Sequence, residues 1–412
     1  MRILALSNLY PPHVIGGYEL GCRDVVETLR KRGHEVHVLT SMYGIGHPES
    51  SDHVDRTLET RIGKRPPSNR LQGIGDTIKL ESTNQRLFFA AVKKFKPDVV
   101  YGWNMDGISI TLILFAQELG IPVSLFISDH WLIVWRQQSI LNLWRLTTPD
   151  SELNLPRKLG RAALTMTGLM PYQLNLDLSH AQFCSDFLRN EITEDRDLVS
   201  NALIAHWNVD TTLFYPDYDR PSGKKAVYCG QLSPHKGVHI ALEAYCKAVS
   251  RGGASDAELT IAGGALDESY LASLKEIPQK YGINSGVKFI GKVSREALAQ
   301  IYREHDILLF PSIWDEPFSI ALLEGMASGL AVVGTMTGGT PEILLDEVNA
   351  LTYAKENVDE CAAQIERLFD SQELRISLSN AALKAIQERF AFPRMVDLIE
   401  ADLELAVSRT KR

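Results

Sequence analysis

Residues 310–326 read Phe-Pro-Ser-Ile-Trp-Asp-Glu-Pro-Phe-Ser-Ile-Ala-Leu-Leu-Glu-Gly-Met, a loop that leads from an apolar strand into an apolar helix. Two carboxylates stand eight positions apart in this stretch, Glu316 in the loop and Glu324 inside the helix. Nearly every side chain from 318 to 330 is apolar or small, which predicts a helix that is buried all round. A buried carboxylate is costly without a partner, and the positions one helical turn from Glu324 carry no cation. We therefore expect Glu324 to meet either a distant Arg or Lys or the hydroxyls of a ligand.

Length and composition limit the classes of protein to which the chain can belong. A chain of 412 residues is too long for one core and fits two domains, and 45% hydrophobic with 23% charged residues is typical of globular proteins. No apolar run reaches the roughly 18 residues that cross a bilayer, and residues 1–7 read better as a first strand than as a signal peptide. The five cysteines lie far apart without Cys-x-x-Cys spacing, which indicates a reducing cytoplasm. A net charge of −8 without a basic stripe argues against nucleic acid as a partner.

Strands and helices alternate along the chain, which predicts parallel sheets covered on both faces. In the first half we expect strands at 2–7, 35–40, 98–101, 122–127 and 180–185, and helices at 18–32, 81–95, 109–119 and 155–168. Residues 41–80 are polar and glycine-rich, and are expected to form a long functional loop or an irregular insertion. In the second half we expect strands at 226–229, 258–262, 287–290, 306–310, 331–334 and 350–353, and helices at 237–250, 267–281, 294–304 and 318–328. The chain is expected to be helical after residue 356.

The alternation breaks near residues 201–216, where a strand is followed by a polar connection, so we place the domain boundary there. The first domain is expected at 1–207 and the second at 208–389. Two doubly wound halves joined by a short connector imply a cleft between them, at the carboxyl ends of both sheets.

Glycine-containing loops follow several expected strands, where ligands of such sheets bind. Gly16 and Gly17 precede the first helix, so the backbone there can approach a ligand, although the spacing is not that of a dinucleotide fingerprint. Lys236 beside Gly237 begins a helix, a good position for holding a phosphate. Residues 337–342 read Thr-Gly-Gly-Thr-Pro-Glu. Each loop alone is compatible with ordinary turn chemistry.

The start of the 318–328 helix adds a fourth signal. Its first amides have no other acceptor, so they could donate hydrogen bonds to a bound anion. Four such signals at matching positions in two halves predict a phosphate-bearing ligand in the cleft.

The combination of the Glu316–Glu324 pair, the glycine–lysine loop at 230–237, Gly16-Gly17 and residues 337–342 resembles the retaining glycosyltransferases of family 4. That family has the GT-B fold, two doubly wound Rossmann-like domains that face each other across a cleft. The resemblance covers almost the whole chain, and residues 390–412 are similar to the family's last helix, which crosses back to the first domain. It implies that the first domain takes the acceptor and the second the donor.

The resemblance also implies roles for individual residues toward a nucleotide-sugar donor. Lys236 would contact the diphosphate, Glu316 the hydroxyls of the transferred sugar, and Glu324 the two ribose hydroxyls. The remaining donor contacts that it implies are the amides of Phe318, Ser319 and Ile320 at the β-phosphate, the backbone around Lys292 and Val293 at the base, Gln231, and Gly16 and Gly17 from the first domain. No metal or other cofactor is expected, because a lysine and helix amides neutralise the leaving diphosphate.

Two positions depart from the family pattern. Gln231 stands where the family usually has an arginine, so a neutral amide replaces one of the cations that would contact the diphosphate. A hydrogen bond to a charged partner contributes about 1.5–3 kcal/mol, and the amide retains only part of this. Ser128 stands at the usual histidine position, whereas Asp129 is kept and His130 follows it. Glu316, Lys236, Asp129 and His130 are therefore the catalytic candidates, with an ordinary loop role as the alternative for His130.

Trp131, Trp135 and Trp144 lie among aliphatic residues. Core packing is the default interpretation, and the alternatives are stacking on a sugar acceptor or contact with a membrane interface. The basic residues of the 41–80 segment are expected to be solvated, with anionic lipid or a diphosphate acceptor as the alternative partner.

These observations predict a cytoplasmic, metal-independent, retaining hexosyltransferase. It would move a sugar from a nucleoside diphosphate, with UDP expected from its frequency in the family, to a glycan or lipid-linked acceptor, as in polysaccharide biosynthesis. Peripheral contact with the inner face of the membrane stays open. The rival interpretations are a GT-B nucleotide-sugar epimerase and a protein that binds a nucleotide sugar without reacting it.

Overall fold

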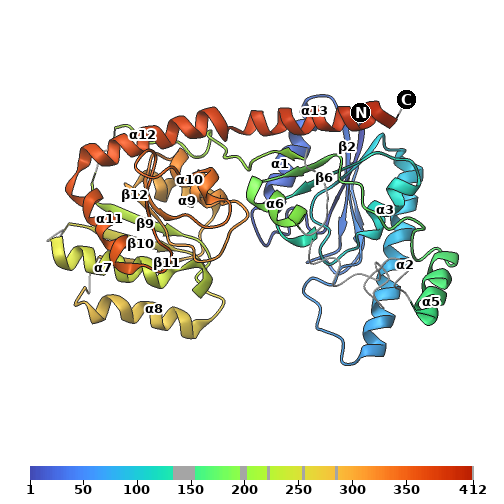
Figure 1. The fold of residues 1–412 in the computed structure, drawn as a ribbon, viewed down its shortest axis with the longest axis horizontal. Helices are drawn as coiled ribbons and strands as arrows, with labels where there is room; N and C mark the ends of the chain where they lie inside the picture. Colours follow the sequence, from blue (N-terminus) through green and yellow to red (C-terminus); the bar gives the residue numbers. More distant parts are fainter. Residues whose placement is uncertain (133–153, 195–201, 220–222, 253–255, 284–285, 411–412) are drawn as a thin grey trace. The chain divides into compact units, whose positions relative to one another are not determined.

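The computed structural model describes residues 1–132, 154–194, 202–219, 223–252, 256–283 and 286–410 (Figure 1). These residues form two compact α/β units. Unit 1 comprises Met1–Cys184, Leu188–Ala205 and Val396–Arg412, and unit 2 comprises Ser185–Phe187 and His206–Met395. Each unit is built on a predominantly parallel sheet, which confirms the predicted fold class.

The sheet of unit 1 has the strand order β3-β4-β2-β1-β5-β6-β7-β8 within the described part of the chain, and only the short β3 is antiparallel to its neighbour. Its strands are β1 (Arg2–Ser7), β2 (Glu35–Ser41), β3 (Glu49–Ser50), β4 (Val54–Leu58), β5 (Val99–Gly102), β6 (Val123–Ile127), β7 (Ala181–Phe183) and β8 (Leu203–Ile204). The inner strands β5 and β6 are buried along their whole length, as expected for parallel strands that are covered on both faces.

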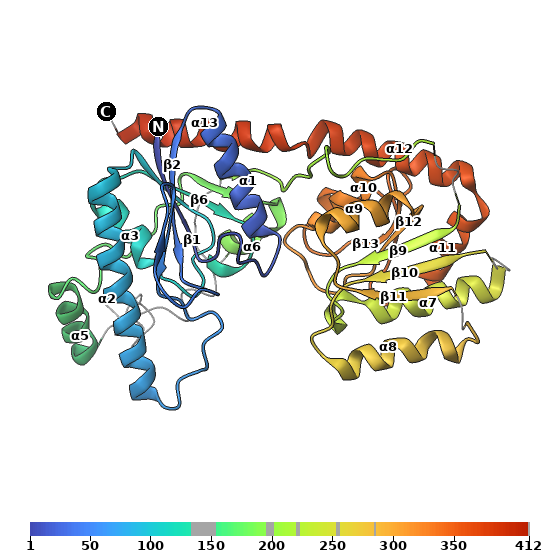
Figure 2. The same ribbon diagram turned by 180° about the vertical axis from the view of Figure 1, so that it is seen from behind.

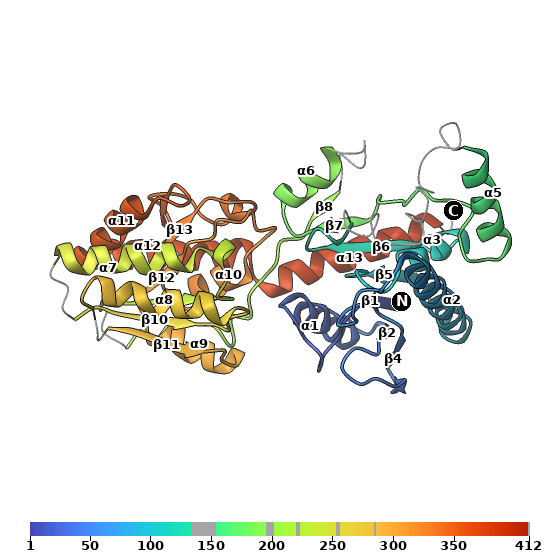
Figure 3. The ribbon, with the colours of Figure 1, turned by 90° about the horizontal axis from the view of Figure 1, so that it is seen from below.

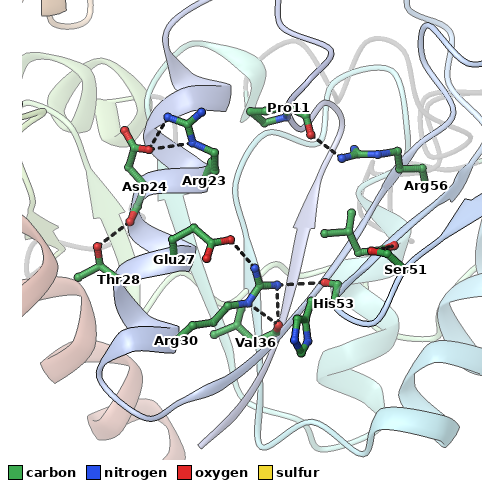
Figure 4. Close-up of polar contacts among 11 residues, drawn as sticks. Pro11, Arg23, Asp24, Glu27, Thr28, Arg30, Val36, Ser51, His53 and Arg56 are labelled. Atoms are coloured by element: carbon green, nitrogen blue, oxygen red, sulfur yellow. Dashed lines mark hydrogen bonds and ion pairs between the residues drawn. The ribbon is translucent and has the colours of Figure 1, made fainter.

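Helices cover both faces of this sheet. The helices of unit 1 are α1 (Tyr18–Lys31), α2 (Arg70–Phe95), α3 (Thr111–Glu118), α5 (Leu155–Met166), α6 (Asp186–Glu194) and the later part of α13 (Phe392–Thr410); α5 has no buried residue and lies at the periphery. Figure 3 shows α1 on one side of the sheet and α2 and α3 on the other. Helix α1 is fixed to the sheet by Arg30, which pairs with Glu27 at 2.6 Å and donates to the carbonyls of Val36 and His53 (Figure 4).

Unit 2 has a fully parallel sheet of order β11-β10-β9-β12-β13-β14 in its described residues. The strands are β9 (Lys225–Cys229), β10 (Glu258–Ala262), β11 (Val287–Gly291), β12 (Ile307–Phe310), β13 (Ala331–Thr335) and β14 (Leu351–Tyr353). The helices are α7 (Val238–Gly252), α8 (Glu268–Lys280), α9 (Arg295–Arg303), α10 (Ile320–Ala327), α11 (Val358–Asp370) and α12 (Gln372–Arg389), with short 3-10 turns η3 (Pro234–Lys236) and η4 (Thr340–Glu342). Helices α7 and α8 lie on one side of the sheet, and α9 and α10 on the other (Figures 1 and 2).

The expected irregular loop at 41–80 is wrong in two places. Strands β3 and β4 interrupt it, and α2 begins at Arg70 rather than near residue 81. The side chain of Asn69 caps this helix by accepting from the amide of Gln72. Gly73 and Gly75 each lower helix propensity by up to about 1 kcal/mol, but the cap and the packing of α2 on β4 and α3 outweigh that cost.

Three basic residues of this segment have partners inside unit 1. Arg56 donates to the carbonyl of Pro11 (Figure 4) and to that of Tyr10, which ties β4 to the loop after β1. Arg61 donates to the hydroxyl of Thr77 at 2.7 Å, and the ammonium of Lys64 pairs with Glu59 at 2.7 Å.

Residues from Val396 onward belong to unit 1, to which α13 is attached by an ion pair with Arg32 and by polar contacts with two histidines. Glu400 contacts both Arg32 and His34, and Asp402 lies 2.9 Å from the ring nitrogen Nδ1 of His180. None of the helices in the described part of the chain combines the length and apolar character that crossing a membrane requires.

Candidate active site

Lys236 and Glu316 form an ion pair at the carboxyl edge of the unit 2 sheet. The ammonium of Lys236 lies 2.9 Å from Oε1 of Glu316 and 5.0 Å from the centroid of the Trp314 ring. Lys236 ends the turn after β9 and Glu316 follows β12, its neighbour in the sheet, so parallel pairing brings the two loops to the same edge. The side chains are only 22% and 10% exposed, which strengthens their attraction relative to a surface pair.

Gly237 allows the Lys236 turn to pack directly on the Glu316 loop. Its φ of +68° lies in the left-handed region, and a Cβ built there would stand 1.9 Å from the carbonyl oxygen of Pro311. No other residue type fits this position without moving one of the two loops.

The glycine pair of residues 337–342 supports the same loop from the other side. A Cβ on Gly338 would lie 2.3 Å from the carbonyl oxygen of Glu316, and one on Gly339 would lie 2.2 Å from that of Pro317. The amide of Gly339 donates to the carbonyl of Glu316 at 2.7 Å, and that of Gly338 to the carboxylate of Asp315 at 3.2 Å. This motif therefore holds the Glu316 loop by close backbone packing.

Helix α10 begins at Ile320, two residues later than predicted, because Ser319 is its N-cap and accepts from the amide of Leu322. The amides of Phe318, Ser319 and Ile320 donate to no acceptor among the described residues. They lie directly after Glu316 in sequence, so the positive end of the helix dipole begins beside the Lys236–Glu316 pair.

Glu324 is buried in α10, with 7% of the residue exposed. Of the two partners that the sequence leaves open, the structure shows a distant arginine, whose Nε lies 3.1 Å from Oε1 of Glu324. This residue, Arg295, is the first of α9 and was not singled out from the sequence. Burial raises the pKa of Glu324 to about 7, against the opposing effect of Arg295.

The segment expected to contact the base lies at the end of β11. Lys292 is exposed and Val293 is half-buried, in the turn that leads from Gly291 to α9. Gln231 is exposed after β9, and its carbonyl accepts from the hydroxyl of Tyr228 at 2.9 Å. Gly263, after β10, donates its amide to the carbonyl of Gly291 at 2.9 Å. Sequence reasoning missed the Gly263-Gly264 pair, although it follows an expected strand as the other glycine pairs do.

In unit 1, Gly16 and Gly17 are exposed, but their loop already holds an anion of its own. The carboxylate of Glu19, wholly buried, accepts from the amides of Ile15 at 2.9 Å and Gly16 at 3.0 Å. The amide of Gly16 is therefore already occupied by this carboxylate. The spacing of three residues between Gly16 and an acid in the first helical turn is the signal that would have revealed this contact.

Asp129 lies after β6 and is held from two sides. Its carboxylate accepts from the side-chain amide of Asn104 at 2.9 Å and from the amide of Trp131 at 2.8 Å. Burial raises the pKa of Asp129 to about 6, and the hydrogen bond from Trp131 opposes this rise. His130 is directed to another partner, since its Nε2 lies 2.7 Å from the carboxylate of Glu191 on α6.

A hydrogen-bond chain that the sequence did not reveal connects Asp129 to the glycine loop. The side-chain amide of Asn8 donates to Oδ1 of Asn104 at 3.3 Å, and Oδ1 of Asn8 accepts from the hydroxyl of Tyr18 at 2.7 Å. The chain joins the carboxyl ends of β1, β5 and β6. Trp131 is buried, in agreement with core packing, and Trp135 and Trp144 lie outside the described residues.

Two protein-family models match the chain. Residues 218–385 match the family model of glycosyl transferases group 1, and residues 15–156 match that of glycosyltransferase family 4. An uncharacterized glycosyltransferase of Methanocaldococcus jannaschii is 23% identical over 411 residues, which cover 95% of each chain.

Two solved structures share the fold along nearly the whole chain. Sucrose-phosphate synthase from Thermosynechococcus elongatus superposes with a TM-score of 0.71 at 16% identity and covers 99% of both chains. Anabaena HepE in complex with UDP and glucose gives a TM-score of 0.66 at 16% identity, over 98% of this chain and all of that one. The chain belongs to the family 4 glycosyltransferases with the GT-B fold, and it is a glycosyltransferase.

Proposed function

We propose that this glycosyltransferase transfers a sugar from UDP to a glycan or lipid-linked acceptor with retention of configuration and without a metal ion, as in polysaccharide biosynthesis. The observation that carries the proposal is the Lys236–Glu316 pair beside the free amides of Phe318, Ser319 and Ile320. An ammonium group and free N–H groups at a helix start are the donors that a diphosphate takes. The UDP bound to Anabaena HepE supports UDP as the carrier.

The two acids that we propose bind the donor form ion pairs, Glu316 with Lys236 and Glu324 with Arg295. We propose that the donor exchanges the first of these pairs. Its diphosphate takes the ammonium of Lys236, which leaves the carboxylate of Glu316 to accept from hydroxyls of the transferred sugar. Since one charged contact replaces another, Lys236 does not have to be desolvated again when the donor arrives.

Bond cleavage places additional negative charge on the departing diphosphate. Lys236 and the amides at the start of α10 stabilise that charge, and they are already oriented before the reaction. The departing oxygen takes the proton of the acceptor hydroxyl, which attacks from the same face. Gln231 contributes only a neutral side chain to this diphosphate site. The roles proposed for Gly16, Gly17, Lys292 and Val293 stay predictions.

We propose that unit 1 supplies the acceptor side. Asp129 is held by Asn104 and Trp131 and keeps a pKa of about 6, so its protonation state changes near neutral pH. The proposed cytoplasmic location is supported by all five cysteines being free thiols.

A thermal-shift panel of UDP, GDP, ADP and TDP sugars tests the donor. A ligand at a hundred times its Kd stabilises the protein by roughly 2.7 kcal/mol, which for a domain of this size raises the melting temperature by about 5–11 °C. The UDP sugar should give the largest shift, and NMR of the first product should show the donor's anomeric configuration. Turnover of the donor without an acceptor into an epimeric nucleotide sugar, an inverted product, or no shift with any donor would contradict the proposal.

A further inference from the structure

We propose that Arg295 is a positioning residue for the nucleotide ribose, which keeps Glu324 as a carboxylate with one oxygen free and so sets the pH range in which the nucleotide binds. The inference rests on the proposed function, because it takes Glu324 to be the acceptor for the ribose hydroxyls.

The position of the Arg295 side chain is fixed from both ends. Its backbone opens α9, where the side chain of Ser294 caps the helix by accepting from the amide of Ala297. Its guanidinium carbon lies 5.3 Å from the centroid of the buried Phe214 ring, a distance typical of a cation–π contact. From this position, the guanidinium donates through Nε to Oε1 of Glu324 at 3.1 Å.

The contact leaves Glu324 with capacity for a ligand. Arg295 donates to Oε1, and no described residue donates to Oε2. A carboxylate has about four acceptor sites, and a two-pronged arginine contact would occupy both oxygens. The single contact through Nε leaves enough sites for two hydroxyls.

Arg295 is the charged group that acts on Glu324 within the described part of the chain. The other titratable groups that face it are the thiol of Cys229 at the end of β9 and the phenol of Tyr302 on α9. Burial raises the pKa of Cys229 to about 12 and that of Tyr302 well above its usual value, so both stay neutral between pH 6 and 9. Over this range, Glu324 is the group of this cluster that titrates.

Removing the charge of Arg295 should raise the pKa of Glu324 further, because burial would then be unopposed. The protonated acid has fewer acceptor sites, so it binds two hydroxyls less well. We expect Arg295→Gln to weaken UDP binding about tenfold or more at pH 7.5, as one unit of pKa corresponds to a factor of ten. The loss should shrink as the pH is raised to 9, and Arg295→Lys should restore most of the affinity.

The experiment is a calorimetric titration of UDP into wild type and variants from pH 6 to 9. For each variant, the ratio of its Kd for UDP to the wild-type Kd is compared across pH, so that the effect of the titration of UDP itself cancels. Arg303→Gln is the matched control, because Arg303 lies on the same helix and also packs on an aromatic ring, that of Tyr215, at 4.6 Å. The ratio of the Kd of Arg303→Gln to the wild-type Kd should not change with pH.

A loss in Arg295→Gln that is the same at every pH would mark Arg295 as merely structural and would overturn the inference. Tighter UDP binding by this variant would also overturn it, since Arg295 would then be a competitor that the ribose displaces. A wild-type protein that binds UDP at no pH would contradict the proposed function itself, which separates the two failures.

Discussion

Replacing Gly237 by alanine should destabilise unit 2 more than the same change at Gly282, although the two glycines have nearly equal φ angles of +68° and +69°. An alanine in the left-handed region costs roughly 1–2 kcal/mol at either position. A Cβ at Gly282 meets nothing within 4 Å, whereas one at Gly237 stands 1.9 Å from the carbonyl oxygen of Pro311. An ordinary contact begins at 3.4 Å, so the Lys236 turn must move by 3.4 − 1.9 = 1.5 Å. Such overpacking costs about 1–3 kcal/mol, which predicts losses of about 2–5 kcal/mol at Gly237 and about 1–2 kcal/mol at Gly282.

Thermal unfolding of the two variants measures this difference. For a domain of this size, each kcal/mol lowers the melting temperature by about 2–4 °C, so we expect decreases of about 4–20 °C for Gly237→Ala and about 2–8 °C for Gly282→Ala. UDP binding supplies a second measurement. A shift of the Lys236 turn displaces the ammonium that we propose binds the diphosphate, so Gly237→Ala should weaken UDP binding at temperatures where the protein is folded, and Gly282→Ala should not. Equal melting temperatures in the two variants, or wild-type UDP affinity in Gly237→Ala, would refute the reasoning.

Three further predictions concern the charged groups. Lys236→Met should destabilise unit 2 by about 1–3 kcal/mol, because it leaves Glu316 buried without its cation, and should weaken UDP binding at least tenfold in calorimetry. Lys236→Arg should retain most of the stability and most of the UDP affinity. Wild-type UDP affinity in Lys236→Met would contradict this prediction. Burial raises the pKa of Asp129 from 3.8 to about 6, so ionising this side chain costs the folded protein stability; the cost develops as the pH rises from about 4 to about 6 and is fully present above pH 6. Asp129→Asn should therefore raise the melting temperature more at pH 8 than at pH 4, and an equal change at both values would count against it. Transfer should proceed at the same rate in EDTA as in buffer with Mg²⁺, and a loss that added divalent metal restores would show that a metal takes part.

The sequence predicted the elements whose residues carry an unambiguous pattern. Strands β1 and β10 have the predicted bounds, because parallel strands that are buried on both faces are uninterrupted apolar runs between polar turns. The beginning of α2 was missed, because polar residues with Gly73 and Gly75 give no helical periodicity. Packing on β4 and α3 decides that segment, and packing of this kind is invisible in a local pattern.

The candidate site likewise contains contacts that the sequence predicted and contacts that it did not. The loops of Lys236 and Glu316 were predictable, since the carboxyl ends of parallel strands share an edge wherever the strands lie in the sheet. The contact of Arg295 with Glu324 was not, because helical periodicity identifies partners only on the same helix and these residues lie on α9 and α10. The chain from Tyr18 through Asn8 and Asn104 to Asp129 likewise depends on the strand order of unit 1.

The central claim is that Glu324 serves the ribose and Glu316 the transferred sugar on one diphosphate site of unit 2. Titration of UDP and of UDP-glucose into the wild type, Glu316→Ala and Glu324→Ala tests it most directly. Glu324→Ala should lose affinity for both ligands by the same factor, and Glu316→Ala should lose mainly the additional affinity that the glucose contributes. Equal losses for both ligands in both variants would contradict this assignment.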